Sequence, residues 1–161
     1  MIILSMLLII DGPDGAGKTT FAKAFGGNYH HEGPPPTDMG PGNLLGYYLD
    51  IVRRAATSGK FGTVVFDRLA FSELVYGPVV RNVVRLEMHD YAAFIQETRR
   101  WGAVHVLCLP PFEVAKDNWR IKRAQGKEYV TDTLVYDRIY GTFNFYKDTQ
   151  DAVYDYTRGT R

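Results

Sequence analysis

The chain of 161 residues contains one cysteine, Cys108, so no internal disulfide can form. Cys108 lies in the apolar run Val104 to Leu109, which predicts a small buried hydrophobic side chain and not a reactive thiol. A chain without disulfides suits a reducing compartment. We therefore expect a cytoplasmic location.

Long hydrophobic runs are missing as well. No segment approaches the ~20 apolar residues that a membrane-spanning helix requires. The apolar segment Ile2 to Ile10 has neither the basic flank nor the small-residue cleavage site of a signal peptide. We expect no membrane partner.

The chain has almost no excess of either charge. Nineteen Lys and Arg side chains stand against eighteen Asp and Glu, which leaves no overall field that would attract nucleic acid or an anionic membrane. No internal repeat is visible, and hydrophobic residues make up 45% of the chain. This length and composition predict a single domain over residues 1–161.

What the chain does contain is a glycine-rich motif directly behind its first apolar segment. Residues 12–19, GPDGAGKT, fit the pattern G-x-x-x-x-G-K-T. The preceding run Ile2 to Ile10 predicts a strand buried on both faces, and Thr19 to Phe25 predicts a short helix that ends at Gly26-Gly27. This order of strand, loop and helix is typical of a P-loop, where backbone N–H groups and a helix N-terminus converge on a phosphate.

The motif assigns chemistry to particular residues. Its glycines let the backbone approach a polyphosphate, Lys18 supplies a charge for the β- and γ-phosphates, and the hydroxyl of Thr19 is a ligand for Mg²⁺. The motif therefore predicts binding of a nucleoside triphosphate, with ATP and Mg²⁺ as cofactors. The predicted nucleotide-binding residues are Gly12, Asp14, Gly15, Ala16, Gly17, Lys18, Thr19 and Thr20.

Strands and helices alternate along the rest of the chain. The patterns predict further strands at 28–32, 63–67, 104–109 and 152–157. They predict helices at 44–56 (ended by Gly59), from Ser72 to an interruption at Gly77-Pro78, at 91–101 (capped by Asp90), at 113–124 and at 133–147. The proline-rich segment 33–42 and residues 125–130 are expected to be loops. This alternation predicts a three-layer α/β P-loop fold with a parallel sheet of about five strands and helices on both faces.

The strand at 63–67 ends in an acid. Asp67 is therefore the natural Walker B residue, because a carboxylate there can orient a water bound to Mg²⁺. Arg68 follows at once, and its planar guanidinium matches the phosphate of a second substrate. The guanine-binding signature N-K-x-D of GTPases is absent from the sequence.

A basic group occurs where small P-loop kinases carry a lid. Lys116, Arg120, Arg123 and Lys127 form one stripe if the helix continues that far. Arginines that close over phosphates neutralise charge on the transferred group and exclude water. The sequence therefore predicts a short helical lid over residues 116–130.

These residues resemble the thymidylate kinase family of nucleoside monophosphate kinases, in particular its short phage-like members. The P-loop with its acid at the third position and the segment D-R-x-x-x-S-x-x-x-Y (residues 67–76) carry the likeness. The resemblance implies that Asp14 lies near the acceptor's sugar and phosphate, that Arg68 binds the acceptor phosphate, and that Tyr76 lies under the sugar and selects deoxyribose. It also implies that the lid supplies the catalytic arginine, Arg120 or Arg123. The other predicted catalytic residues are Lys18, Asp67 and Arg68.

Other positions depart from the family pattern. Glu73 replaces the usual asparagine, and a carboxylate accepts a hydrogen bond from a base N–H but donates none to a carbonyl. Leu69 replaces the aromatic residue of D-R-Y, and Arg81 is one position away from a family arginine. The predicted acceptor-binding residues are Asp14, Arg68, Ser72, Glu73, Tyr76 and Arg81, and the predicted metal ligands are Thr19 and Asp67.

The leading hypothesis is ATP- and Mg²⁺-dependent phosphoryl transfer to a deoxynucleoside monophosphate, dTMP or a related pyrimidine. A second hypothesis is transfer to a hydroxyl of a deoxynucleoside or of a modified pyrimidine in DNA, with Asp14, Glu32 or Glu73 as base. A third is a non-catalytic nucleotide-binding module. The sequence leaves the oligomeric state open, with a homodimer as one alternative. His30 and His31 are expected on opposite faces of a strand, so we do not expect them to bind one metal ion.

Overall fold

The computed structural model describes residues 6–57 and 62–158 and contains a five-stranded sheet in the order β2-β3-β1-β4-β5. Every neighbouring pair of strands in it is parallel. The strands are β1 (Leu7–Asp11), β2 (Asn28–His31), β3 (Val64–Asp67), β4 (Ala103–Cys108) and β5 (Ala152–Tyr154). Because β3 and β4 flank β1 on its two sides, the loop after β1 lies where the strand order reverses, which is the usual ligand site of such sheets.

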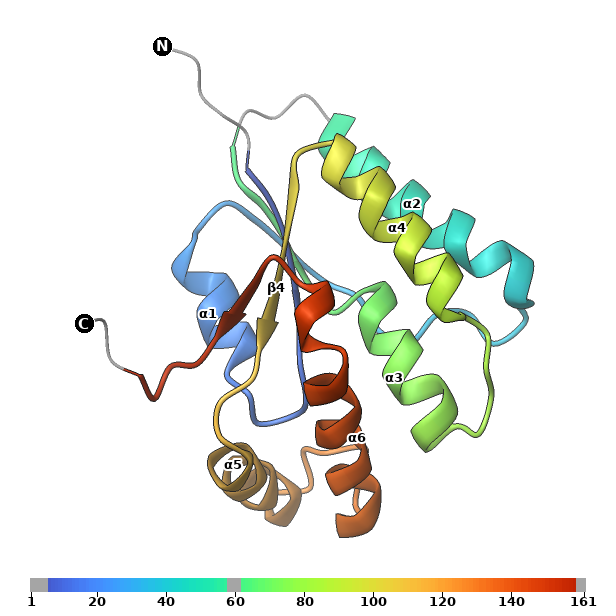
Figure 1. The fold of residues 1–161 in the computed structure, drawn as a ribbon. Coiled ribbons are helices and arrows are strands. Elements are labelled where there is room, and N and C mark those ends of the chain that lie inside the picture. The colour runs from blue at the N-terminus through green and yellow to red at the C-terminus, as the bar shows by residue number, and fades with distance from the viewer. Residues whose placement is uncertain (1–5, 58–61, 159–161) are drawn as a thin grey trace.

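Helices cover both faces of this sheet (Figure 1). On one face lies α1 (Lys18–Ala24), and on the other lie α2 (Pro41–Thr57), α3 (Ala70–Val80), α4 (Met88–Arg100) and α6 (Thr133–Phe145). The remaining helix α5 (Phe112–Ala124) lies beyond the carboxyl ends of the strands, next to the loop after β1. The predicted three-layer α/β architecture is confirmed.

The central strand β1 explains why both faces need a cover. Leu7 and Ile9 point into the larger hydrophobic cluster under α2, α3, α4 and α6, while Leu8 and Ile10 point into a smaller one with Ala22 of α1. A strand that is buried on both faces has no side exposed to solvent, so its sequence is one continuous apolar run. Cys108 is buried in the smaller cluster, as predicted, and burial raises the pKa of its thiol to about 12.

The helix that begins after β3 was wrongly predicted to break at Gly77-Pro78. In the structure α3 continues through both residues to Val80. Pro78 lies in the last turn of α3, where its missing N–H removes one helical hydrogen bond without ending the helix. A Cβ at Gly77 would lie 2.9 Å from the carbonyl oxygen of Val83, so this glycine permits close packing of the returning chain.

Several other boundaries differ from the prediction. α2 begins at Pro41, inside the predicted loop, because proline is compatible with a first helical turn. α4 begins at Met88, with Asp90 in the first turn accepting a hydrogen bond from the backbone N–H of Glu87 at 3.1 Å. α6 ends at Phe145 and a 3-10 turn follows, and β5 ends at Tyr154. Residues 2–5 of the predicted first strand and Gly59 lie outside the described residues.

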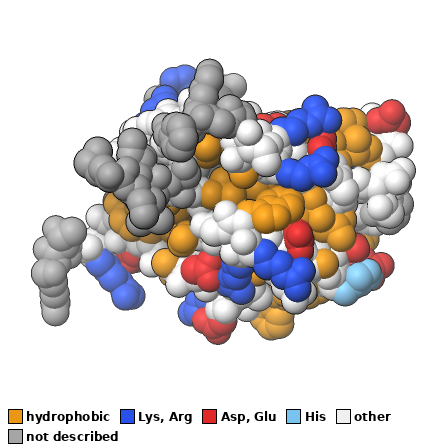
Figure 2. Space-filling model, turned by 90° about the horizontal axis from the view of Figure 1, so that it is seen from above, with side chains coloured by type: hydrophobic (Ala, Val, Ile, Leu, Met, Phe, Trp, Pro, Cys, Tyr) orange, Lys and Arg blue, Asp and Glu red, His pale blue; other side chains and the backbone are white. Residues whose placement is uncertain are grey.

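Seen from above, basic and acidic side chains lie beside each other around hydrophobic ones (Figure 2). Charges of opposite sign also pair across the surface of the protein, for example Arg99 with Asp151 at 2.7 Å and Arg100 with Glu97 at 3.0 Å. No helix within the described part of the chain is long and apolar enough to cross a membrane.

A buried histidine lies in the middle of β4. His105 is 1% exposed, and its Nε2 lies 2.8 Å from the hydroxyl of Thr98. Burial lowers the pKa of His105 to about 4, although the charge of Asp151 opposes the shift. Because this pKa is lower than in an unfolded chain, about 6.5, the unfolded chain binds a proton that the folded chain does not over the interval between the two values.

We expect the free energy of unfolding to fall as the pH drops from about 6.5 towards 4. Between pH 7.5 and 5 the wild type should lose about 2 kcal/mol more than His105→Gln, which does not titrate. Urea unfolding at the two pH values measures this difference. Equal losses in the two proteins would rule out His105 as the source.

Candidate active site

The loop between β1 and α1 has the shape of an anion-binding turn. Gly12 has φ 149° and Gly15 has φ 79°, values that other residues rarely adopt. A Cβ at Gly12 would overlap the carbonyl oxygen of Cys108, and one at Gly15 would overlap that of Ala115. The loop is therefore wedged between β4 and α5, and glycine is required at both positions.

Lys18 is the first residue of α1 and is buried, with 6% of it exposed. Its Nζ donates a hydrogen bond to the carbonyl oxygen of Pro13 at 2.6 Å, which places the ammonium group against the loop. Burial, reinforced by the nearby charge of Arg68, lowers the pKa of Lys18 to about 8. The side chain is thus still mostly protonated at pH 7 and presents a positive charge to the loop.

Asp67 lies at the end of β3 and is fully buried. Its Oδ2 accepts hydrogen bonds from the hydroxyls of Thr19 at 2.8 Å and Tyr29 at 2.7 Å. Burial alone would raise the pKa of Asp67, but Lys18 and the two hydroxyls outweigh it and hold the pKa below its usual value. This carboxylate is therefore ionised at neutral pH.

The pair Thr19 and Asp67 fits the predicted Mg²⁺ site. Thr19 donates its one hydroxyl proton to Asp67, so its oxygen lone pairs stay available to a cation. Oδ1 of Asp67 is buried, and no hydrogen bond reaches it from the described residues. Among these residues there is no cluster of three His, Cys, Asp or Glu side chains that could hold a metal. A site with one or two protein ligands suits Mg²⁺, which takes its remaining ligands from phosphates and water.

On the other side of the loop, three predicted acceptor-binding residues contact each other. Asp14 forms an ion pair with Arg68 and accepts a hydrogen bond from the hydroxyl of Tyr76 at 3.1 Å. The Arg68 guanidinium lies over the Tyr76 ring, 5.2 Å from its centre. Burial would raise the pKa of Asp14, but Arg68 and Lys18 reverse the shift and hold it below the usual value. The structure brings these three side chains to one edge of the P-loop.

Arg68 itself has a positive φ of 73°. A left-handed conformation at a non-glycine residue costs about 1–3 kcal/mol and is often found at functional sites. Here it lies in the turn that joins β3 to α3, and it directs the guanidinium back towards Asp14.

Asp11 holds this turn in place, and the sequence analysis missed it. Its Oδ1 accepts hydrogen bonds from the backbone N–H groups of Leu69 (3.2 Å) and Ser72 (3.1 Å) and from the hydroxyl of Ser72 (2.6 Å). Asp11 thus caps α3 from a different strand, in place of a local cap residue. Ser72, predicted to bind substrate, uses its hydroxyl proton in this contact. An acid directly after an apolar strand was the available signal.

Glu73 and Arg81, both predicted to bind the acceptor, are paired with each other. Glu73 is 3% exposed, contacts Arg81, and lies 3.4 Å from Nη2 of Arg85. Arg85 also donates to the carbonyl oxygen of Pro36 at 2.8 Å. Burial raises the pKa of Glu73, and the two arginines oppose that shift. Oε1 of Glu73 and Nε of Arg81 have no hydrogen-bond partner among the described residues.

The four basic residues of the predicted lid do not form one stripe. α5 ends at Ala124, so Lys127 is not part of it, and Lys116 is buried and paired with Asp137 at 2.8 Å. Arg120 is exposed and pairs with Asp117 at 2.9 Å, while the guanidinium of Arg123 lies 5.3 Å from the Trp119 ring centre. The structure places neither arginine in contact with the P-loop residues named above.

The loop after α5 is attached to the P-loop through two aromatic residues. Trp119 donates from its indole N–H to the carbonyl oxygen of Val130 at 2.9 Å and stacks on Tyr136. The hydroxyl of Tyr136 donates to the backbone oxygen of Asp14 at 2.7 Å. Between these anchors lies Glu128, whose pKa is raised to about 7 by burial and by the charge of Asp14. The loop after α5 thus carries a carboxyl group that is influenced by the charge of Asp14.

A cavity of about 480 Å³ lies beside the P-loop. Thr20 and Phe21 of α1, Asn118 of α5 and Tyr154 of β5 are among its lining residues. Asn118 donates to the backbone oxygen of Gly15 at 3.1 Å and to the hydroxyl of Tyr156 at 2.6 Å, so this wall is tied to the P-loop. The cavity has the size of a small-molecule site.

Removal of the Asp11 carboxylate should loosen the turn that carries Arg68. We expect Asp11→Ala to lower the free energy of unfolding by about 1–2 kcal/mol, because two backbone N–H groups lose their partner. Asp11→Asn keeps an acceptor oxygen and should lose less. Urea unfolding of the three proteins measures both changes. Equal losses in the two variants would show that the oxygen does not cap α3.

No protein-family model matches the chain, and no curated protein matches it. Dozens of solved chains are similar to this one, among them the two that follow. YorR of Bacillus subtilis in complex with phosphorylated GDP has 19% identity and a TM-score of 0.70 over 95% of this chain and 87% of that chain. Deoxyadenosine kinase of M. mycoides with dCMP and dCDP has 17% identity and a TM-score of 0.54 over 93% and 90%. At such identities the likeness establishes the fold alone: this chain has a three-layer P-loop fold.

Proposed function

We propose that the protein is a P-loop kinase that transfers the γ-phosphoryl group of ATP, with Mg²⁺, to the phosphate of a deoxynucleoside monophosphate. The observation that carries this proposal is the linkage of the P-loop to the end of β3. Thr19, next to Lys18 at the start of α1, donates to Asp67, and Arg68, the residue after Asp67, pairs with Asp14 of the loop. A donor phosphate bound to the loop would therefore meet an arginine suited to a second phosphate.

On the donor side, the loop N–H groups and Lys18 would bind the β- and γ-phosphates. The cavity beside the loop would take the adenosine, with Asn118 and Tyr154 among the groups near the base. Thr19 and Asp67 would hold Mg²⁺, which neutralises charge on the transferred phosphoryl when bound.

On the acceptor side, Arg68 would exchange part of its pairing with Asp14 for the acceptor phosphate. Tyr76 lies under the guanidinium and would pack against the sugar. The acceptor phosphate is already an anionic nucleophile, so no strong general base is required. Catalysis would come from positioning and charge neutralisation.

The base of the acceptor would meet the cluster of Glu73, Arg81 and Arg85. Oε1 of Glu73 lies 3.4 Å from Arg85, and both this oxygen and Nε of Arg81 are buried, so a base would have to enter between these side chains to use them as acceptor and donor. A base edge with adjacent N–H and carbonyl groups, such as that of dTMP or a related pyrimidine, suits this pair. The cluster favours a nucleobase over a plain phosphate, which donates no hydrogen bond when fully ionised.

Arg120 and Arg123 remain the proposed lid arginines, and either would need to turn inwards when the lid closes. Both are exposed on α5, so an inward turn would cost Arg120 its exposed ion pair with Asp117 and Arg123 its contact with the Trp119 ring. The similarity to a deoxyadenosine kinase with dCMP and dCDP supports a deoxynucleotide or deoxynucleoside as substrate.

One observation favours a second acceptor, a hydroxyl on a deoxynucleoside or on a modified pyrimidine in DNA. Glu128 lies in the electrostatic reach of Asp14 and Arg68, and burial raises its pKa to about 7. A hydroxyl, unlike a phosphate, needs a base, and a carboxylate of near-neutral pKa can accept its proton.

Labelled ATP offered with each of three acceptor classes separates these functions. The classes are a panel of deoxynucleoside monophosphates, free deoxynucleosides, and duplex DNA that contains 5-hydroxymethyl pyrimidines. We expect label in a diphosphate. Label confined to DNA or to a nucleoside would overturn the first acceptor in favour of the second. ATP binding without transfer to any of them would indicate a non-catalytic module.

The donor site has its own test. Lys18→Ala should lower phosphoryl transfer by at least about a hundredfold, since its charge on the γ-phosphate is lost. Lys18→Met keeps more of the buried packing and should lose as much activity. Steady-state assays give the rates, and circular dichroism verifies that both variants fold. Near wild-type turnover in a folded variant would contradict the assignment.

A further inference from the structure

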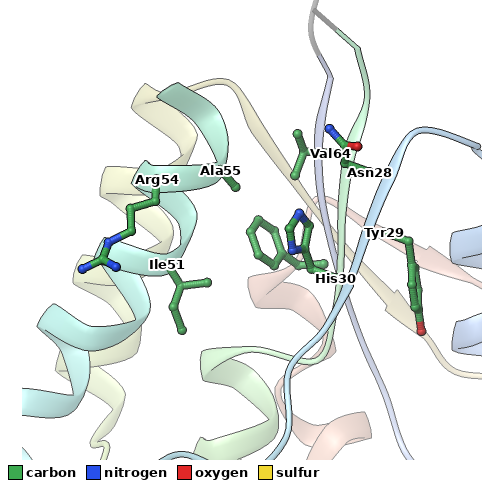
Figure 3. A pocket seen from close by; sticks show the side chains of 8 residues that line it. Asn28, Tyr29, His30, Ile51, Arg54, Ala55 and Val64 are labelled. Carbon is green, nitrogen blue, oxygen red and sulfur yellow. The ribbon is translucent and has the colours of Figure 1, made fainter. Parts of the chain in front are cut away.

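The edge strand β2 brings a second hydroxyl to the buried Asp67. In the register of β2 and β3, His31 lies opposite Asp67, and Tyr29 lies two residues earlier on the same face. His30 points to the other face and stacks on Phe66 at 5.1 Å. Figure 3 shows this division: His30 points towards the pocket between β2 and α2, and Tyr29 points away from it.

Two hydroxyls from different elements therefore converge on one carboxylate oxygen. Thr19 reaches Oδ2 of Asp67 from α1 at 2.8 Å, and Tyr29 reaches the same oxygen from β2 at 2.7 Å. Both distances are those of well-formed O–H···O hydrogen bonds. His31 Nδ1 lies at 3.5 Å from this oxygen, and its side chain is half exposed, so it adds little to the fixation.

The last side-chain torsion of an aspartate is soft, so a carboxylate turns easily about its Cβ–Cγ bond. One donor leaves such a rotation possible, because the donor can follow the oxygen. Donors on α1 and β2 hold Oδ2 from two directions, so the carboxylate cannot rotate. The other oxygen, Oδ1, then points in one fixed direction. Oδ1 is the buried oxygen that no described group hydrogen-bonds.

We propose that Tyr29 is a positioning residue that fixes Asp67 so that Oδ1 faces a water molecule of the bound Mg²⁺. This inference rests on the proposed function and extends it to a residue that touches neither nucleotide. Its hydroxyl donates to the carboxylate, and the Tyr29 ring packs against the small cluster around α1. Tyr29 therefore acts through Asp67 and not on the reacting atoms.

The variant Tyr29→Phe removes this one hydroxyl and keeps the ring. Mutation of a residue that hydrogen-bonds to a metal ligand typically weakens metal binding by about 10–100-fold. We therefore expect the apparent Kd of Mn²⁺ to rise about tenfold in this variant. Electron paramagnetic resonance of Mn²⁺ in the presence of a non-hydrolysable ATP analogue measures this constant. Without metal, the analogue should raise the thermal unfolding midpoint of Tyr29→Phe by as much as it raises that of the wild type.

Tyr140→Phe is the matched control. It also loses a hydroxyl that donates over 2.7 Å, here to the carbonyl oxygen of Pro110, outside the site. We expect a wild-type Mn²⁺ constant in this protein. An unchanged constant in Tyr29→Phe would overturn the inference, as would a loss of metal-free analogue binding, because Tyr29 would then serve the P-loop itself. If the analogue raises the thermal unfolding midpoint of neither the wild type nor the two variants, the proposed donor site itself is overturned.

Discussion

The buried carboxylate of Asp67 is the constraint on which the rest of the site depends. It joins the end of β3 to α1 through Thr19 and to β2 through Tyr29, and Lys18 keeps it ionised in a place where burial opposes its charge. A buried anion is tolerated only with such partners. The lysine that would bind phosphate, the threonine that would bind metal and the strand that carries the acid are therefore fixed relative to one another.

A second buried acid connects the P-loop to the turn that carries Arg68. Asp11 ends the strand that leads into the P-loop, and the same side chain caps α3, which follows Arg68. The loop and the arginine are thus tied to one residue at the centre of the sheet. Any shift of β1 would move both, so the distance between them is set by the core and not by loops.

Local patterns were sufficient for part of this structure. The P-loop, the acid at the end of β3 and the alternation of strands and helices all depend on neighbouring residues, and the sheet and its layers were predicted from them. The contacts of Tyr29 and Asp11 were not, because they join residues 38 and 58 or more positions apart. They follow only from strand register and strand order. The start of α2 was missed because a proline suits a first helical turn, and the continuation of α3 past Pro78 was missed because a proline is expected to end a helix. The partners of the charged side chains on α5 and of Glu73 also depend on distant residues.

The packing of α5 against the P-loop has a consequence for motion. Gly15 leaves no space for a side chain between the loop and this helix, and Asn118 binds the backbone oxygen of Gly15. A rotation of the whole helix would break these contacts. α5 therefore keeps its position against the loop, so Arg120 and Arg123 could approach the P-loop only by turning their own side chains.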